Sequence, residues 1–383
     1  MYLRPWQPRK RRSIWPWFLA VIVAVAVGWF LYSKQREIFE AIAGPLPTPT
    51  PTEISAREYV AEADRAFERG ELDAAIAKYQ RATELDPTLG IAYARWARIE
   101  TLRSDTETGV TLAHRATEQS TADPQEVAEC LAILAMALDW AGKAPEAVAM
   151  ALKATDQDPS SAIAHAYLAE AYADSGRIPD ALETTDQALE LAPDDPFVLR
   201  SVGYVHEATG QYQAAIDYYE QAIAINPHLA FIYLDLGRNY RVLGDLDTAV
   251  QQFERAADAD PNDPQILDQL GWTYFSMGAY ELARDTLLEA IRLDPTFARA
   301  YGRLGITYYV RRNYEDAIVA LEQAIELGAE TEENYYTLGL SHAYLGDCEA
   351  AIPLLEEALR INPNSQPALR GLADCESSAS DEP

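Results

Sequence analysis

The sequence predicts an all-α protein in which pairs of antiparallel helices stack into a solenoid, preceded by one apolar helix that spans a membrane. Three observations support this fold class. From residue 56 onward the chain resembles itself at a period of 34 residues. Glycine and proline recur at fixed places in that period, where they would end helices. Ahead of the repeats, residues 14–32 form an uncharged and mostly apolar stretch.

The charge of the chain is strongly acidic and unevenly distributed. The 383 residues are 49% hydrophobic and carry a net charge of −29. The first 36 residues nevertheless contain seven basic side chains and no acidic one. A surface as acidic as that of the remaining chain repels phosphate backbones, so we expect no nucleic-acid partner.

The apolar stretch over residues 14–32 is predicted to be a single-pass transmembrane helix. As a helix, its 19 residues would measure about 28 Å, close to the thickness of the hydrocarbon core of a bilayer. Trp15, Trp17 and Trp29 lie near its ends, where indole rings favour the membrane interface. Five basic residues precede it, so the positive-inside rule places residues 1–13 in the cytoplasm and the repeats outside it.

A cleaved signal peptide is the alternative interpretation of this segment, and it would make the protein secreted. Ala41, Ile42 and Ala43 resemble a cleavage site. Charged residues separate them from the apolar stretch, however, and the stretch is longer than the usual core of a signal peptide. An uncleaved anchor in the cell membrane is therefore the favoured prediction.

Residues 33–55 connect the membrane helix to the repeats. Residues 33–43 are predicted to be helical, and residues 44–52 alternate proline with other residues. Such a pattern favours polyproline II, which would span about 28 Å here at roughly 3.1 Å per residue. The segment is either a semi-rigid stalk or an unstructured linker, and both interpretations place a domain boundary there.

Three kinds of residue mark the repeats. Small residues, which let two helices approach closely, recur at Ala63, Ala97, Ala135, Ala169, Gly203, Gly237, Gly271, Gly305 and Gly339. Glycines that can end a first helix in a left-handed conformation are Gly70, Gly142, Gly176, Gly210, Gly244, Gly278 and Gly346. Prolines that close a second helix are Pro87, Pro159, Pro193, Pro227, Pro261, Pro295 and Pro363.

This pattern resembles the tetratricopeptide repeat, whose period is 34 residues. The unit over residues 196–229 shows it well, with Gly203, Gly210, Tyr212, Tyr219 and Pro227. The units so identified are 56–89, 90–127, 128–161, 162–195, 196–229, 230–263, 264–297, 298–331 and 332–365, numbered one to nine below. A capping helix is predicted over 366–376 and a disordered tail over 377–383. The resemblance implies a right-handed superhelix of about nine units, held together by stacking between neighbours.

Two units depart from the pattern. Unit two has Ser104 in place of the turn glycine, Gly109 in place of an alanine, and four extra residues before unit three. Its second helix is therefore expected to be distorted. Unit eight has Arg312 in place of the turn glycine and Ala329 in place of the proline. Only small local changes are expected there.

The sequence contains no recognisable catalytic, metal or cofactor motif. Nucleotide-binding loops, serine-hydrolase elbows and zinc-peptidase helices are absent, and no cysteine–histidine cluster has zinc-ligand spacing. We therefore expect neither an enzyme nor a bound cofactor. Binding of a protein or peptide partner is the function that the repeats predict.

The family resemblance also implies which side chains line the inside of the superhelix. Carried over to units five to nine, it predicts a peptide-binding groove formed by Phe197, Arg200, Tyr204, Phe231, Leu234, Arg238, Arg241, Trp272, Phe275, Arg299, Tyr309 and Tyr336. Apolar anchors beside arginines suit a partner with acidic residues or a free carboxylate. The alternative is that the aromatic rings pack against neighbouring helices and the arginines pair with local acids.

The repeat frame gives two of the three cysteines a possible pairing. Cys348 follows the turn of unit nine, and Cys375 lies at the far end of the capping helix, which should run beside that unit. A disulfide is predicted if the repeats lie outside the cytoplasm, and two free thiols are the alternative. Cys130 has no evident mate and is expected to be a small core residue.

The predicted function is thus a membrane-anchored, non-enzymatic scaffold that binds protein partners outside the cytoplasm. An accessory subunit of an envelope enzyme or assembly system would have a similar sequence and stays open as an alternative.

Overall fold

The computed structural model describes residues 15–35, 37, 54–120 and 123–380, and within them all regular structure is helical. The chain divides into two compact units, residues 1–54 and residues 55–383. The predicted cytoplasmic segment, most of the juxtamembrane segment and the proline-rich stalk lie outside the described residues.

The first unit contains α1 (Trp15–Ser33), a helix of 19 residues with a mean hydropathy of 1.9. It coincides with the predicted membrane helix to within one residue at each end. Its length and composition suffice to cross a membrane, and a signal sequence would meet the same criterion.

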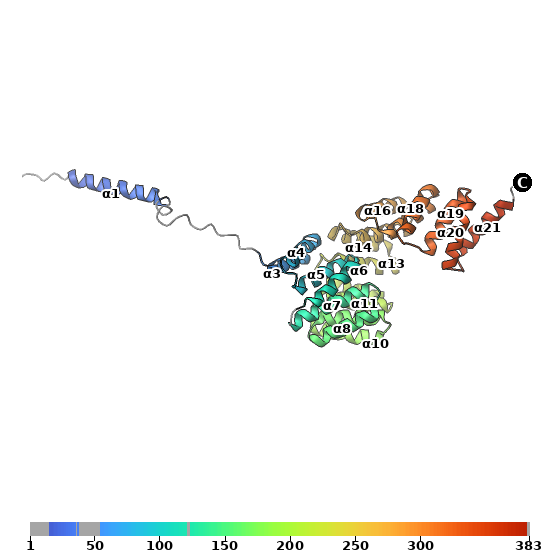
Figure 1. Cartoon of the computed structure of the whole chain (residues 1–383), viewed down its shortest axis with the longest axis horizontal. Coiled ribbons are helices and arrows are strands. Elements are labelled where there is room, and N and C mark those ends of the chain that lie inside the picture. Colours follow the sequence, from blue (N-terminus) through green and yellow to red (C-terminus); the bar gives the residue numbers. More distant parts are fainter. Residues whose placement is uncertain (1–14, 36, 38–53, 121–122, 381–383) are drawn as a thin grey trace, which may run out of the picture. The chain divides into compact units, whose positions relative to one another are not determined.

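The second unit consists of nine helical hairpins and a terminal helix (Figure 1). The hairpins are α3 (Ala56–Glu68) with α4 (Leu72–Leu85), α5 (Gly90–Leu102) with α6 (Thr106–Glu118), α7 (Pro124–Trp140) with α8 (Ala144–Gln157), α9 (Ala162–Asp174) with α10 (Ile178–Leu191), α11 (Pro196–Ala208) with α12 (Tyr212–Ile225), α13 (Ala230–Val242) with α14 (Leu246–Ala259), α15 (Pro264–Ser276) with α16 (Tyr280–Leu293), α17 (Ala298–Val310) with α18 (Tyr314–Glu326), and α19 (Glu332–Tyr344) with α20 (Cys348–Ile361). The terminal helix is α21 (Gln366–Ser380).

The small residues on the first helix of a hairpin create room for large side chains of the second. Tyr219 lies against Gly203 and Phe253 lies against Gly237, and both rings are fully buried. A Cβ atom at Gly203 would come within 2.6 Å of the Tyr219 ring, and one at Gly237 within 2.5 Å of the Phe253 ring. The close helix approach predicted from the small-residue series is therefore present.

The hairpin turn survives in the two units that lack a glycine there. Ser104 has φ 60° and Arg312 has φ 61°, the left-handed conformation that the turn glycines adopt in the other units. A side chain in this conformation costs roughly 1–2 kcal/mol, which the packed hairpin tolerates. The two helices of unit eight, α17 and α18, are regular, which agrees with the expectation of only small changes there.

The expected distortion of the second helix of unit two was wrong. α6 is a regular helix of 13 residues. A Cβ atom at Gly109 would lie only 2.2 Å from Thr101 Oγ1, so the glycine makes room for the threonine on the partner helix. The four extra residues do not disturb α6 either, because α7, at 17 residues, is one turn longer than the other first helices.

The capping helix is longer than predicted. α21 packs against α19 and α20 and extends to Ser380, so residues 377–380 are helical where a disordered tail was expected.

Contacts between distant units add to the stacking of neighbours, which corrects the expectation that neighbour contacts alone hold the array together. Units one and two pack directly against units five and six through a set of residues that we call the clasp. The clasp comprises Phe67, Asp73, Arg98, Arg103, Phe197, Phe231, Asp260 and Asn262.

An aromatic stack and a polar cluster form the clasp. The Phe197 ring lies between those of Phe67 and Phe231, with centroid distances of 6.0 and 5.7 Å. Arg103 donates two hydrogen bonds of 2.8 Å to the two carboxylate oxygens of Asp260, 157 residues away in the sequence. Asn262 Nδ2 donates to Asp73 Oδ2 over 2.8 Å. Through these contacts the beginning of the array, units one and two, meets units five and six.

Candidate functional site

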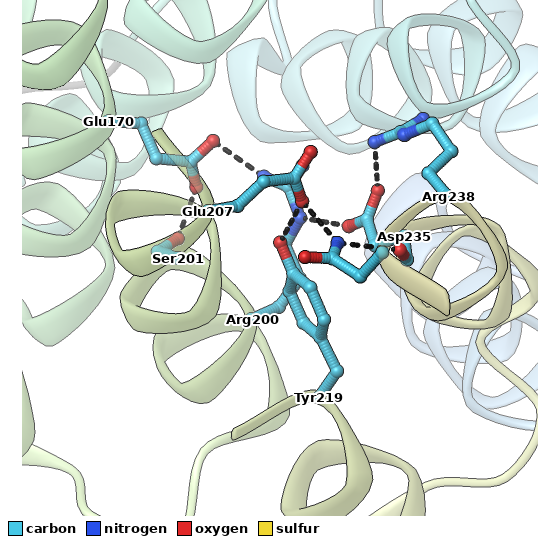
Figure 2. Close-up of polar contacts among 8 residues, drawn as sticks. Glu170, Arg200, Ser201, Glu207, Tyr219, Asp235 and Arg238 are labelled. Atoms are coloured by element: carbon cyan, nitrogen blue, oxygen red, sulfur yellow. Dashed lines mark hydrogen bonds and ion pairs between the residues drawn. The ribbon is translucent and has the colours of Figure 1, made fainter. Parts of the chain in front are cut away.

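The inner side of units four to six contains a buried network of ion pairs centred on Arg200 (Figure 2). Arg200 donates to Glu170 Oε2 over 2.5 Å and to Asp235 Oδ2 over 2.8 Å, and all three side chains are at most 5% exposed. Ser201 also donates to Glu170, and Arg238 pairs with Asp235. Burial alone would lower the pKa of Arg200, but the carboxylates of Asp235 and Glu170 outweigh it and raise that pKa well above its usual value.

Contacts within the chain, the clasp among them, cover much of the predicted groove in units five and six. Phe231 and Leu234 are each 8% exposed, and Phe197 is held between two other rings. Tyr204 is half-buried and donates to Asp174 Oδ1 over 2.6 Å. Arg200, Phe197, Phe231 and Leu234 are therefore engaged within the chain and are not open to a partner in this structure.

The predicted residues of units six to nine include an accessible group around Asp268. Arg299 Nε donates to Asp268 Oδ2 over 2.8 Å, and Arg303 Nη1 donates to the same oxygen over 2.7 Å. The Arg303 guanidinium also lies 5.0 Å from the centre of the Trp272 ring. Asp268 is fully buried, whereas the Arg299 side chain is 46% exposed.

Arg303 was missing from the sequence prediction. The repeat frame assigns the inner position to its neighbour Gly302, which lies against Asn334, where a Cβ atom would meet Asn334 Oδ1 at 2.8 Å. A glycine at an inner position has no side chain to contact a partner. That signal could have identified the adjacent Arg303 as the candidate binding residue of this unit.

Arg241 has no acidic partner among the ion pairs of the described residues. Its one hydrogen bond is a long one, of 3.4 Å, to Thr273 Oγ1, and its guanidinium lies 5.7 Å from the centre of the Phe253 ring. Burial, together with the nearby guanidinium groups of Arg303, Arg238 and Arg299, lowers the pKa of Arg241 to about 10. Four arginines thus gather where acids are too few to balance them.

An open pocket of about 400 Å³ adjoins two of these arginines, Arg299 and Arg303. Its lining consists of Trp272, Arg299, Gly302, Arg303, Ile306, Ala329, Thr331, Glu333 and Asn334. We call the group formed by Arg241, Trp272, Arg299 and Arg303 the arginine face; Arg299 is exposed and the other three are partly buried. It combines an aromatic wall with guanidinium donors, the chemistry that suits an acidic peptide.

The remaining predicted aromatic residues form local clusters. Phe275 stacks on Trp272 with a centroid distance of 4.5 Å. Tyr309 contacts Tyr314 and Tyr344, at 5.8 and 6.1 Å. Tyr336 is half-buried against the capping end of the array. None of these three lines the pocket beside the arginine face.

The structure supports the predicted pairing of two cysteines. Cys348 and Cys375 form a disulfide with a Cα–Cα distance of 5.5 Å, while Cys130 is free and buried. Burial raises the pKa of the Cys130 thiol to about 12, as expected for an unreactive core residue. Across the described residues, no group of three or more potential ligands is arranged to hold a metal ion.

Removing the disulfide is expected to loosen the capping end. The bond joins positions 27 residues apart, and the chain-entropy model then assigns it roughly 3–4 kcal/mol. A Cys348→Ala, Cys375→Ala variant should show faster amide exchange in α20 and α21, as a reductant should in the unaltered chain. The double variant must not respond further to reductant. Unchanged exchange in both cases would contradict the stabilising role.

Comparison with known proteins agrees with the repeat architecture. A family model described as the cilia and flagella-associated protein 70 C-terminal domain matches residues 194–383, and a tetratricopeptide repeat model matches residues 160–227. No curated protein matches the chain in sequence.

Solved structures extend the likeness of the fold to most of the chain. A chain of the APC/C hetero-tetramer Cut9–Hcn1 is similar with a TM-score of 0.58 and 17% identity, over 90% of this chain and 81% of that one. Pseudomonas aeruginosa pilF is similar with a TM-score of 0.51 and 17% identity, over 57% of this chain and 98% of that one. The two family models and the shared fold together support assignment of this chain to the tetratricopeptide repeat family.

Proposed function

We propose that this protein is a membrane-anchored scaffold that binds an acidic segment of a partner protein at the arginine face, outside the cytoplasm. Tetratricopeptide arrays are typically protein-interaction scaffolds without catalytic activity, and two of the structure's features favour this role. Arg299 is 46% exposed beside an open pocket, and two arginines there share one carboxylate, that of Asp268, in a protein that is acidic as a whole. The N-terminal apolar helix and the basic residues before it favour the membrane anchor and its orientation.

The observation that supports the proposal most strongly is the excess of positive charge around Arg241. Arg299 and Arg303 share the single carboxylate of Asp268, and Arg241 has none. A carboxylate from a partner would supply the missing charge and accept hydrogen bonds that are stronger than neutral ones. Because the chain carries a net charge of −29, an acidic partner would be repelled elsewhere and favoured here.

Replacing Arg241 with glutamine is expected to weaken binding of an acidic peptide about tenfold or more. A hydrogen bond to a charged group contributes roughly 1.5–3 kcal/mol, and about 1.4 kcal/mol corresponds to a tenfold change in affinity. The probe is a fluorescent peptide rich in aspartate, glutamate and one aromatic residue, titrated by anisotropy against the full chain in lipid nanodiscs.

Two controls define what would refute the proposal. Arg292→Gln removes an exposed arginine that pairs with Glu289 within one helix, and binding should not change. A peptide in which asparagine and glutamine replace the acids should bind much more weakly. Equal affinity for the two peptides, or an Arg241→Gln variant that binds normally, would contradict the proposed site.

The anchor and its orientation require a separate experiment. Sequencing of the N-terminus of the membrane-extracted protein distinguishes an uncleaved anchor from a product that begins near Gly44. Protease added to intact cells whose outer layers are permeable should remove the repeats if they lie outside the cytoplasm. Protection of the repeats under those conditions would reverse the proposed orientation.

A further inference from the structure

A second pocket, lined by residues of units two to six, opens apart from the pocket beside the arginine face. It has a volume of about 420 Å³, and Asp139, Trp140, Asp174, Arg200, Tyr204 and Arg238 contribute to its lining. Asp139 occupies the penultimate position of α7 and is only 5% exposed. Its Oδ1 atom has no hydrogen-bond partner. A buried carboxylate oxygen without a donor is costly, and the Asp139 residue lines a space large enough for a ligand group.

The charges around this pocket favour a cation. Both arginines of the wall are already paired, Arg200 with Glu170 and Asp235, and Arg238 with Asp235. Asp174 accepts only the hydroxyl hydrogen of Tyr204 through Oδ1, and Asp139 Oδ1 accepts nothing. Within the described residues, Asp139 and Asp174 therefore have no basic partner in an ion pair, whereas both arginines of the wall have acidic partners.

We propose that this pocket is a binding site for an ammonium or guanidinium group, which Asp139 and Asp174 would hold against the Trp140 wall. Such a group can be the end of a lysine or arginine side chain of a partner, or a free small amine. The site does not depend on the function proposed above, because it involves other units and the opposite ligand charge.

The protonation of Asp139 gives the site a measurable signature. Burial, together with the charges of Asp174 and Glu170 and against the opposing charge of Arg200, raises the pKa of Asp139 to about 8. The empty site thus holds a mostly neutral carboxyl group at pH 7, and a bound cation would favour the ionised form. Binding must then release a proton, and affinity should fall about tenfold from pH 7 to pH 6. Guanidinium ligands isolate this effect, since they stay charged over the whole range.

Calorimetric titration of the full chain in nanodiscs tests the proposal. The probes are butylamine, a short blocked peptide with a single lysine, its arginine analogue, and the same peptide with norleucine. We expect the lysine and arginine peptides to bind with proton release, seen as a dependence of the measured heat on the ionisation enthalpy of the buffer. Butylamine binding as well would identify a site for free amines, whereas binding of the peptides alone would identify a partner's side chain.

Substitutions complete the test. Asp139→Asn should weaken cation binding at least tenfold and abolish the proton release, and it should not unfold the protein, because it removes a buried unpaired acid. Glu146→Gln changes an exposed acid at the start of α8 and should leave binding unaltered. Equal binding of the norleucine peptide, absence of binding by every cation, or unaltered affinity in Asp139→Asn would overturn the proposal.

Discussion

Replacing Arg200 with alanine is expected to lower the stability of units four to six by roughly 3–5 kcal/mol. The substitution leaves two carboxylates, Glu170 and Asp235, in a buried site with one fewer guanidinium between them. An unpaired buried charge is far more destabilising than the loss of an exposed ion pair. Amide hydrogen exchange of the full chain should show the loss as faster exchange in α9, α11 and α13.

A rescue variant distinguishes this cause from a simple loss of packing. Adding Glu170→Gln to Arg200→Ala removes one of the two carboxylates and should restore part of the lost protection. Arg292→Ala, which breaks an exposed pair within one helix, should cost less than about 0.5 kcal/mol. If Arg200→Ala behaves like Arg292→Ala, the buried network contributes no net stability.

The helices of the array could be predicted from the sequence because their signals are local and repeated. A turn glycine such as Gly210 and a terminating proline such as Pro227 act on their own segment of backbone. Where one signal fails, as at Arg312, the neighbouring signals keep the hairpin in register. The buried pairs of Gly203 with Tyr219 and of Gly237 with Phe253 follow from the same period.

The clasp could not be predicted in this way. Arg103 and Asp260 meet only because small rotations accumulate from unit to unit until units one and two reach units five and six. The repeat pattern specifies neighbours and gives no measure of that curvature. The same limit applies to the groove, since Phe197 is covered by Phe67 from four units away and Phe231 stacks on the other side of Phe197.

Within the described residues, the predicted groove thus divides into a part whose arginines have acidic partners and a part in which an arginine has none. Arg200 of unit five and Arg238 of unit six are balanced by Glu170 and Asp235, as the alternative interpretation of the sequence stated. In units six to eight fewer acids face the arginines, and Arg241 remains without one. Which arginines are balanced depends on side chains from three successive units, a combination that one helix pattern does not reveal.

Replacing Phe67 with alanine is expected to open the clasp at a cost of roughly 3–5 kcal/mol. The ring is 5% exposed and contacts both Phe197 and the guanidinium of Arg98, which lies 4.6 Å from its centre. Without the ring, the polar contacts of Arg103 with Asp260 and of Asn262 with Asp73 would still join units one and two to unit six, and neighbour stacking would supply most of the remaining support. Units one to six should then cease to unfold as one block, and α3 to α6 should exchange faster than α11 to α14.

Phe297→Ala is the matched control, because Phe297 packs between units seven and eight, away from the clasp. It should weaken those two units and leave the exchange of α3 to α6 unaltered. In the Phe67→Ala variant, Phe197 and Phe231 would also become accessible, so a hydrophobic dye should bind more strongly than to the Phe297→Ala variant. Unchanged exchange in units one and two, or equal dye binding by the two variants, would show that the clasp does not hold the first six units together. Phe197 and Phe231 would then again be candidates for partner binding.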